Sequence, residues 1–407
     1  MEPLTDPHFM LNDHMLLLLK YTMKVTSTLG FCPLRVDTVH GKVVVNNWSW
    51  ARAVHFWSWI FAYVIIVLPT HTIEVWLGSK DVQSLRSNKT VIYLLVTNLF
   101  CWFFTLLLGV ISLNPLAVCQ IFNGLFKYLE TFPGKYIEKR NRKRDQIKKI
   151  QMELLCATST FVLLFTCFLF VFYIFLNPNA PPFPAYRVPR QYLSLPIYLV
   201  ACLWPGIFGF GFCAIINLLL CGIIFIFFIM DPITRDELRL GRSEYNTIDR
   251  LREPFHLVLN YRAIQIYIKT INTELGVLFV PGQMLMTQII LVCNVSLLFQ
   301  WDLFALNTKI FIAFLSLIPF FSYSLVLRMA GLQYQNSLKT VRSWTLAKWS
   351  RRQDRMYMER IHKVCLPISF GDGKRFVINP MKVLMFFKSV SQNTFRAIAT
   401  YGKVFGY

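Results

Sequence analysis

Residue types that support catalysis or metal binding occur in this sequence, but their spacing fits neither chemistry. A structural or catalytic metal needs several histidine, cysteine or carboxylate ligands at characteristic intervals. His55, His71, His256 and His362 are instead scattered along the chain. The sequence offers no glycine-rich phosphate loop and no nucleophile with a neighbouring base. We therefore expect a protein that is not an enzyme and has no metal site and no cofactor.

Polar residues with an informative spacing lie in the last apolar segment, residues 380–407. At about 100° per residue of helix, one arc of roughly 100° collects a polar stripe. The stripe consists of Lys382, Ser389, Gln392, Asn393, Arg396, Thr400, Lys403 and Tyr407. A membrane helix must turn such a stripe toward protein or water. Several symmetric copies of the chain could direct their stripes inward around a shared pore. That pore would be lined by the six stripe residues from Ser389 to Lys403. The alternative is an amphipathic helix lying flat on the membrane surface.

The elements that position this helix are predicted membrane spans. The chain has 407 residues, of which 55% are hydrophobic and 15% charged, with a mean hydropathy of +0.47. A soluble enzyme of this size would be less apolar. Segments long enough to cross a bilayer lie at 53–77, 91–114, 153–176, 194–229, 276–299, 310–331 and 380–407. The sequence thus predicts an all-α polytopic membrane protein with seven transmembrane helices. The fourth segment is interpreted as one long helix that Pro205 could bend.

The distribution of basic residues predicts the orientation of the chain. The net charge is +21, and the densest basic stretch is EKRNRKRDQIKK, residues 138–149. Lysine and arginine concentrate in cytoplasmic loops of membrane proteins, so this charge does not require a nucleic-acid partner. Four segments hold 31 of the 42 basic residues, namely 1–52, 115–152, 230–275 and 332–379. We therefore expect a cytoplasmic amino terminus and, after seven crossings, an extracellular carboxyl terminus. Asn88, in the sequon Asn88-Lys89-Thr90, then falls in an outer loop as a candidate glycosylation site.

Two other classes of membrane protein fit the sequence less well. A G-protein-coupled receptor also has seven spans, but its amino terminus is outside, which would place the basic loops on the wrong side of the membrane. It is the main alternative. A secondary transporter would be expected to hold its coupling ion on buried carboxylates. The predicted spans offer almost none, because Glu74 lies near a helix end and Asp302 lies in a loop.

The inverted topology, the long fourth helix, the basic cytoplasmic loops and the polar terminal helix together resemble the insect odorant and gustatory receptor superfamily. Gustatory receptors often carry Thr-Tyr, five residues and then Gln-Phe near the end, and this chain has Thr394-Phe395, five residues and Tyr401-Gly402. The stretch NYRAIQIYIKTINTELG, residues 260–276, also looks like the cytoplasmic helix of these receptors. The gustatory branch is slightly favoured.

The resemblance implies a subunit of a tetrameric, ligand-gated, non-selective cation channel in the plasma membrane of sensory neurons. It divides the chain into residues 1–331, with spans 1–6 and the ligand pocket, a cytoplasmic anchor at 332–379, and the pore helix at 380–407. In the anchor, Trp344, Trp349 and several arginines suit a helix exposed to cytoplasm. Partners would be a small organic tastant or odorant and either further copies of this chain or an odorant co-receptor. The pocket is predicted to contain Tyr93, Thr97, Phe170, Tyr173, Tyr198, Trp204, Phe208 and Phe314.

Arg396 and Lys403 depart from the scheme that the resemblance implies. Rings of positive charge in a pore should repel cations. These residues could form salt bridges or lie between subunits. Alternatively, the assembly is heteromeric with fewer such charges, or the helix is rotated about its axis so that its polar stripe does not face the pore. A selectivity different from that of the family is a further alternative.

The predicted orientation can be tested with epitopes fused at each terminus. In intact, unpermeabilised cells an antibody should label the carboxyl-terminal epitope and not the amino-terminal one, which should become accessible after permeabilisation. The opposite pattern would favour the G-protein-coupled class, and a cytoplasmic carboxyl terminus would remove the channel interpretation.

Overall fold

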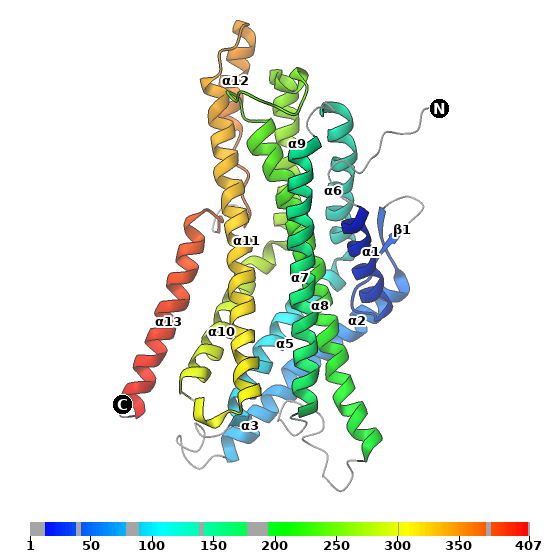
Figure 1. Ribbon diagram of the computed structural model, residues 1–407, viewed down its shortest axis with the longest axis vertical. Coiled ribbons are helices and arrows are strands. Elements are labelled where there is room, and N and C mark those ends of the chain that lie inside the picture. The colour runs from blue at the N-terminus through cyan, green and yellow to red at the C-terminus, as the bar shows by residue number, and fades with distance from the viewer. Residues whose placement is uncertain are drawn as a thin grey trace.

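Long helices make up almost the whole chain. The computed structural model describes residues 13–37, 42–78, 89–137, 142–176, 194–299, 301–371 and 376–405. The helices are α1 Asp13–Thr28, α2 Asn47–Ala62, α3 Leu68–Gly78, α5 Lys89–Leu113, α6 Pro115–Tyr136, α7 Arg142–Leu176, α8 Leu195–Pro232, α9 Pro254–Leu275, α10 Phe279–Phe299, α11 Leu306–Leu346, α12 Arg352–Val364 and α13 Met381–Phe405. Short turns join them, namely the π-helical η1 Tyr63–Val67 and η4 Ile233–Glu237 and the 3-10 turns η5 Asp249–Arg252, η6 Gly276–Leu278 and η7 Trp301–Leu303. Figure 1 shows them gathered into an elongated bundle.

The prediction of an all-α polytopic membrane protein is confirmed. Among the described residues, five helical stretches are long and apolar enough to cross a membrane, namely Leu94–Leu113, Ile150–Leu169, Gly209–Glu237, Phe279–Phe299 and Leu306–Leu346. The other two predicted spans coincide with less uniform elements. The first is divided among α2, η1 and α3, and the last is α13, whose basic and polar residues lower its hydropathy.

Helices α8 and α11 are both much longer than a bilayer requires. The 38 residues of α8 extend about 57 Å at 1.5 Å per residue, against a hydrocarbon thickness of about 30 Å. The fourth predicted span is therefore one long helix, as expected, and it continues through Pro205. The 41 residues of α11 were not expected to continue beyond position 331. This helix extends to Leu346 because residues 332–346 contain neither proline nor glycine, the residues that most often end helices.

A β-hairpin near the start of the chain was not predicted. Strand β1, Leu34–Asp37, pairs antiparallel with β2, Lys42–Val45. β-Branched valines favour this conformation, and the buried Val43 faces the core. The side chain of Asn123 on α6 accepts a hydrogen bond from the Val43 amide and donates one to its carbonyl, both at 2.8 Å. The Asn123 side chain therefore connects the β2 backbone to the helical bundle.

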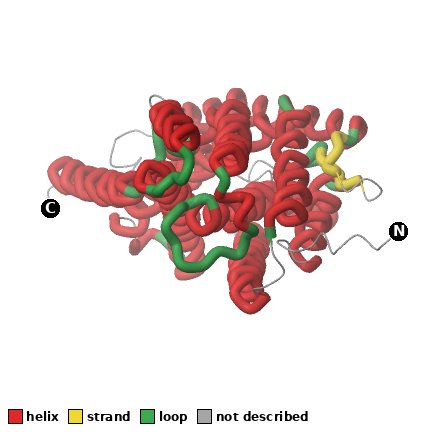
Figure 2. The backbone as a smooth tube through the Cα atoms, turned by 90° about the horizontal axis from the view of Figure 1, so that it is seen from above, coloured by secondary structure: helices red, strands yellow, loops and turns green. Residues whose placement is uncertain are grey.

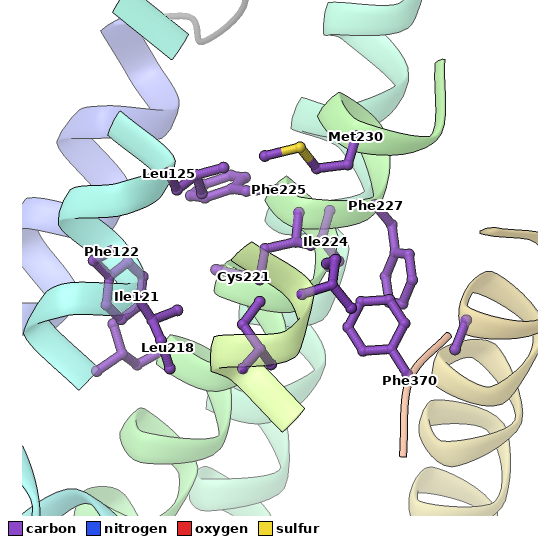
Figure 3. Packing of buried hydrophobic residues seen from close by; sticks show 14 of the residues in the cluster. Ile121, Phe122, Leu125, Leu218, Cys221, Ile224, Phe225, Phe227, Met230 and Phe370 are labelled. Carbon is purple, nitrogen blue, oxygen red and sulfur yellow. The ribbon is translucent and has the colours of Figure 1, made fainter. Parts of the chain in front are cut away.

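The apolar core extends through most of the bundle, and one part of it lies between α6 and α8. Leu125 and Phe122 of α6 meet Phe225 and neighbouring apolar residues of α8 (Figure 3). On another side of α8, Phe227 contacts Phe370 from the segment after α12, with ring centroids 4.9 Å apart. The segment between α12 and α13 therefore shares a core with the long fourth helix.

Trp344 is buried, contrary to the expectation of an exposed anchor helix. Its side chain is fully excluded from solvent, and its ring meets Tyr261 of α9 edge-on at 5.1 Å. The Trp344 Nε1–H donates to the carbonyl of Leu238, at 2.9 Å. The end of α11 is therefore part of a packed junction with α9 and the segment after η4.

Replacing Trp344 with phenylalanine should destabilise this junction. The change removes the Nε1–H donor and leaves the buried Leu238 carbonyl without it, a loss worth about 1–3 kcal/mol. The matched control is Trp102→Phe on α5, where the side chain is 41% exposed and the free energy of unfolding should change by no more than about 0.5 kcal/mol. Thermal unfolding of both variants in detergent micelles measures the difference. Equal effects would contradict this role of Trp344.

Candidate pore helix and ligand pocket

Helix α13 packs on the bundle through one apolar face. It lies at one edge of the molecule, beside α10 and α11, both in the side view and from above (Figures 1 and 2). Phe386 is fully buried and Val390 nearly so. The Phe386 ring contacts Tyr323 of α11 at 5.2 Å, and Phe387 stacks on Phe320 at 5.1 Å. These contacts fix which side of α13 faces the rest of the chain.

The opposite face of α13 has no cover within the described chain. It exposes large apolar side chains such as Leu384, Met385 and Phe395, the last of which is 71% exposed. The predicted polar stripe lies along one border of this face. Its members Gln392, Arg396 and Thr400 are exposed. A single chain thus presents a surface on which polar and apolar residues run side by side.

The rest of the predicted stripe is placed differently. Ser389 and Asn393 are half-buried, and the Asn393 amide donates to the Ser389 hydroxyl at 3.4 Å. Lys403 lies on α13, but its side chain is outside the described residues. Arg396 forms no ion pair with any described residue. Among the described residues of one chain, therefore, no carboxylate neutralises the charge of Arg396.

The segment that leads into α13 is held in place by α9. This α12–α13 connection, of which residues 365–371 and 376–380 are described, receives hydrogen bonds from one side of α9. The Tyr261 hydroxyl and the Gln265 amide both donate to the Leu366 carbonyl at 3.0 Å. Asn272 donates to the Ser369 carbonyl at 2.8 Å and accepts from the Gly371 amide at 3.1 Å. Burial raises the pKa of the Tyr261 hydroxyl above its ordinary value, so the group remains a donor.

Helix α11 holds the same connection from another side. The Ser337 hydroxyl accepts from the Ile368 amide at 2.9 Å. At Gly331 the two backbones almost touch, because a Cβ there would lie 2.9 Å from the Pro380 nitrogen and 3.0 Å from the Asn379 carbonyl carbon. Only glycine permits so close an approach. The starting point of α13 is therefore fixed on α11.

A polar network at the end of α8 was missed by sequence reasoning. The π-helical turn η4 binds α11 through Thr340 Oγ1, which donates to the Thr234 carbonyl at 2.7 Å, and through Gln333, which donates to the Thr234 hydroxyl at 3.2 Å. Next to them the buried Asp236 pairs with Arg235 and Arg242. The one signal in the sequence was the change from a long apolar segment to the polar residues TRDE, 234–237.

The burial of the side chain is described for two of the eight predicted pocket residues. Thr97 on α5 and Phe314 on α11 are both half-buried. The Phe314 ring meets Phe165 of α7 edge-on at 6.0 Å, and Phe165 was not among the predicted residues. The other six lie on α5, α7 and α8, with side chains outside the described part: Tyr93, Phe170, Tyr173, Tyr198, Trp204 and Phe208. Asn88 is also outside the described residues.

No metal centre can be built from the described residues, because no three of their histidine, cysteine or carboxylate side chains converge. Aromatic residues line the contacts between helices, and a polar border follows α13.

Comparison with known proteins gives a structural likeness but no sequence match. No protein family model matches the chain, and no curated protein has a significantly similar sequence. The fold is similar to that of the insect olfactory receptor OR5 from Machilis hrabei in complex with eugenol, with a TM-score of 0.64 and 12% identity over 95% of this chain and 99% of that chain. A second structure of OR5 gives 0.64 and 11% identity over 96% and 99%.

The comparison confirms the expected resemblance at the level of fold. The likeness covers nearly the full length of both chains. The chain therefore has a fold similar to that of an insect olfactory receptor.

Replacing Gly331 with alanine should disturb the start of α13. The added methyl group would meet backbone atoms of Asn379 and Pro380 that cannot rotate away, and overpacking of this kind costs about 1–3 kcal/mol. Gly134→Ala on α6 is the control, since a Cβ there meets nothing within 4 Å, and alanine is a better helix former than glycine. Thermal unfolding in detergent should show a loss of stability for Gly331→Ala alone. A neutral result at Gly331 would mean that the connection is free to shift.

Proposed function

We propose that this protein is a subunit of a chemosensory, ligand-gated cation channel. The observation that carries the proposal is a fold shared over nearly the whole chain with an insect olfactory receptor. A second observation supports the proposal. The side of α13 that no described residue covers, called here the bare face, is bordered by polar residues. The G-protein-coupled alternative gains no support from this likeness.

In the proposed assembly four chains surround a central pore. The polar border of α13 faces water there, while the apolar residues beside it pack on the neighbouring subunit. This arrangement gives both parts of the bare face an environment that suits them, because lipid would cover the polar part unfavourably. The amino terminus is cytoplasmic and the carboxyl terminus extracellular, and the protein acts in the plasma membrane of sensory neurons.

The proposed ligand is a small, sparingly soluble organic tastant or odorant. The related OR5 structure contains eugenol, an example of the chemical class. Aromatic residues on α5, α7, α8 and α11, with few hydroxyl donors among them, would bind such a molecule mainly by apolar burial and shape. Binding would shift the population of channels toward the open state. The partner subunits are either copies of this chain or an odorant co-receptor.

Ligand-evoked currents test the proposal. The chain is expressed in cells alone and together with an odorant co-receptor, and a panel of volatile and tastant molecules is applied. At least one combination should give a current that reverses near the potential expected for a cation channel. Correctly localised protein with no current in either setting would contradict the proposal.

The same recordings test the place of Arg396. Replacing it with glutamine removes one positive charge per subunit from the proposed pore wall. A single charge at about 4 Å in water is worth about 1 kcal/mol, so cation conductance should rise roughly fivefold. Lys388→Gln is the matched control, because it removes the same charge from α13 at a position outside the polar stripe. Equal conductance in the two variants would place Arg396 away from the pore.

A further inference from the structure

Helices α7 and α8 carry four cysteines at their shared interface. The two helices lie side by side along much of their length (Figure 1). Cys156 and Cys167 are 11 residues apart on α7, which is about three helical turns and puts them on one face. Cys213 and Cys221 lie on α8. All four side chains are buried.

The antiparallel packing brings these cysteines together as two pairs. Thr160 of α7 hydrogen-bonds Asn217 of α8 across the interface. Cys156 lies one turn before Thr160, and Cys221 lies one turn after Asn217, so in antiparallel helices these two cysteines face each other. Cys167 and Cys213 belong to one small apolar cluster with Leu163. Each pair joins the same two helices, and each lies at a different level along them.

The surroundings hold each pair in register. Beside the first pair, the Thr160 hydroxyl donates to the side-chain oxygen of Asn217 at 3.1 Å, and the Cys221 thiol lies 3.7 Å from the same oxygen. Beside the second, Val171 and Phe210 pack on the cluster. Figure 3 shows Cys221 on α8 among the apolar residues of the core. Interiors are close-packed, so neither pair can separate without moving a helix.

Simple packing does not explain why cysteines of α7 and α8 face each other at two levels of the same interface. A cysteine used only as a small apolar side chain needs no second sulfur beside it. Cys293 of α10 illustrates that case, since it is buried and has no thiol partner among the described residues. A thiol pair, in contrast, has the sulfurs next to each other, and a disulfide then needs its Cβ atoms about 3.5–4.5 Å apart.

We propose that Cys156–Cys221 and Cys167–Cys213 are two oxidation sites, at each of which a small membrane-permeant two-electron oxidant forms a disulfide that cross-links α7 to α8. In each reaction two S–H bonds break and one S–S bond forms, releasing two protons and two electrons. With a diazenedicarboxamide as oxidant, its N=N bond takes up both protons and both electrons and becomes a hydrazine with two N–H bonds.

The apolar interface selects this product over other thiol chemistry. A disulfide is neutral, like the two thiols that it replaces, so it leaves no charge buried between the helices. A dithiolate complex of a monovalent metal would leave a net negative charge there, which is costly in an apolar environment. Burial also excludes large or charged reagents. The proposal does not depend on channel activity.

Counting reactive thiols tests the proposal in the full-length protein. The chain is placed in lipid nanodiscs, treated with diamide, unfolded in detergent and labelled with a polyethylene glycol maleimide that shifts its mobility on a gel. Four of the ten thiols should lose their reactivity, and dithiothreitol should restore them. Mass spectrometry of non-reduced peptides should identify the linkages 156–221 and 167–213.

Three variants make the result specific. Cys156→Ala should leave only the 167–213 linkage, and Cys167→Ala only the 156–221 linkage. Cys293→Ala is the control that should retain both, and size-exclusion chromatography confirms that each variant is folded. Linkages 156–213 or 167–221, or oxidation elsewhere while both pairs stay reduced, would overturn the proposal. Formation of one pair alone would overturn the assignment of the other.

Discussion

The organisation of this protein depends on how α13 meets its surroundings. One face is satisfied by aromatic packing against α11, in which Phe386 and Phe387 contact Tyr323 and Phe320. The other face carries exposed polar and apolar residues together, and neither water nor lipid alone suits such a surface. The proposed assembly of several chains, in which polar residues meet water and apolar residues meet a neighbour, would resolve this conflict. The other elements can be understood as the means of holding α13 in that position.

The α12–α13 connection supplies the mechanical link. It is bonded to α9 by Tyr261, Gln265 and Asn272 and to α11 by Ser337, and it crosses α11 at Gly331. The first turn of α13 is therefore held where α9 and α11 meet, while its far end lies at the edge of the bundle (Figure 2). In the proposed gating, the far end of α13 would therefore have more room to move than its start. This asymmetry follows from backbone contacts and does not depend on which ligand is bound.

Much of the fold could be predicted because membrane spans have strong sequence signals. The apolar segments that became α5, α7, α8 and α10 were located from length and hydropathy alone, and α8 was identified as one overlong helix. The hairpin was missed because strands of four residues resemble ordinary loop segments in a single sequence. The extension of α11 to Leu346 and the burial of Trp344 were also missed, since charged residues nearby suggested an exposed segment. Burial there depends on Tyr261, which is distant in sequence.

The sequence by itself determined that this is a polytopic helical membrane protein with a polar stripe on its last helix, because helical periodicity and hydropathy act over neighbouring residues. The tertiary structure decided which side of that helix is covered. It left Gln392 and Arg396 exposed to solvent and made Ser389 and Asn393 half-buried. It also decided that Gly331 must be a glycine and that four cysteines meet as two pairs. Those features depend on the distance between segments far apart in the chain, and only the packing of helices against one another fixes that distance.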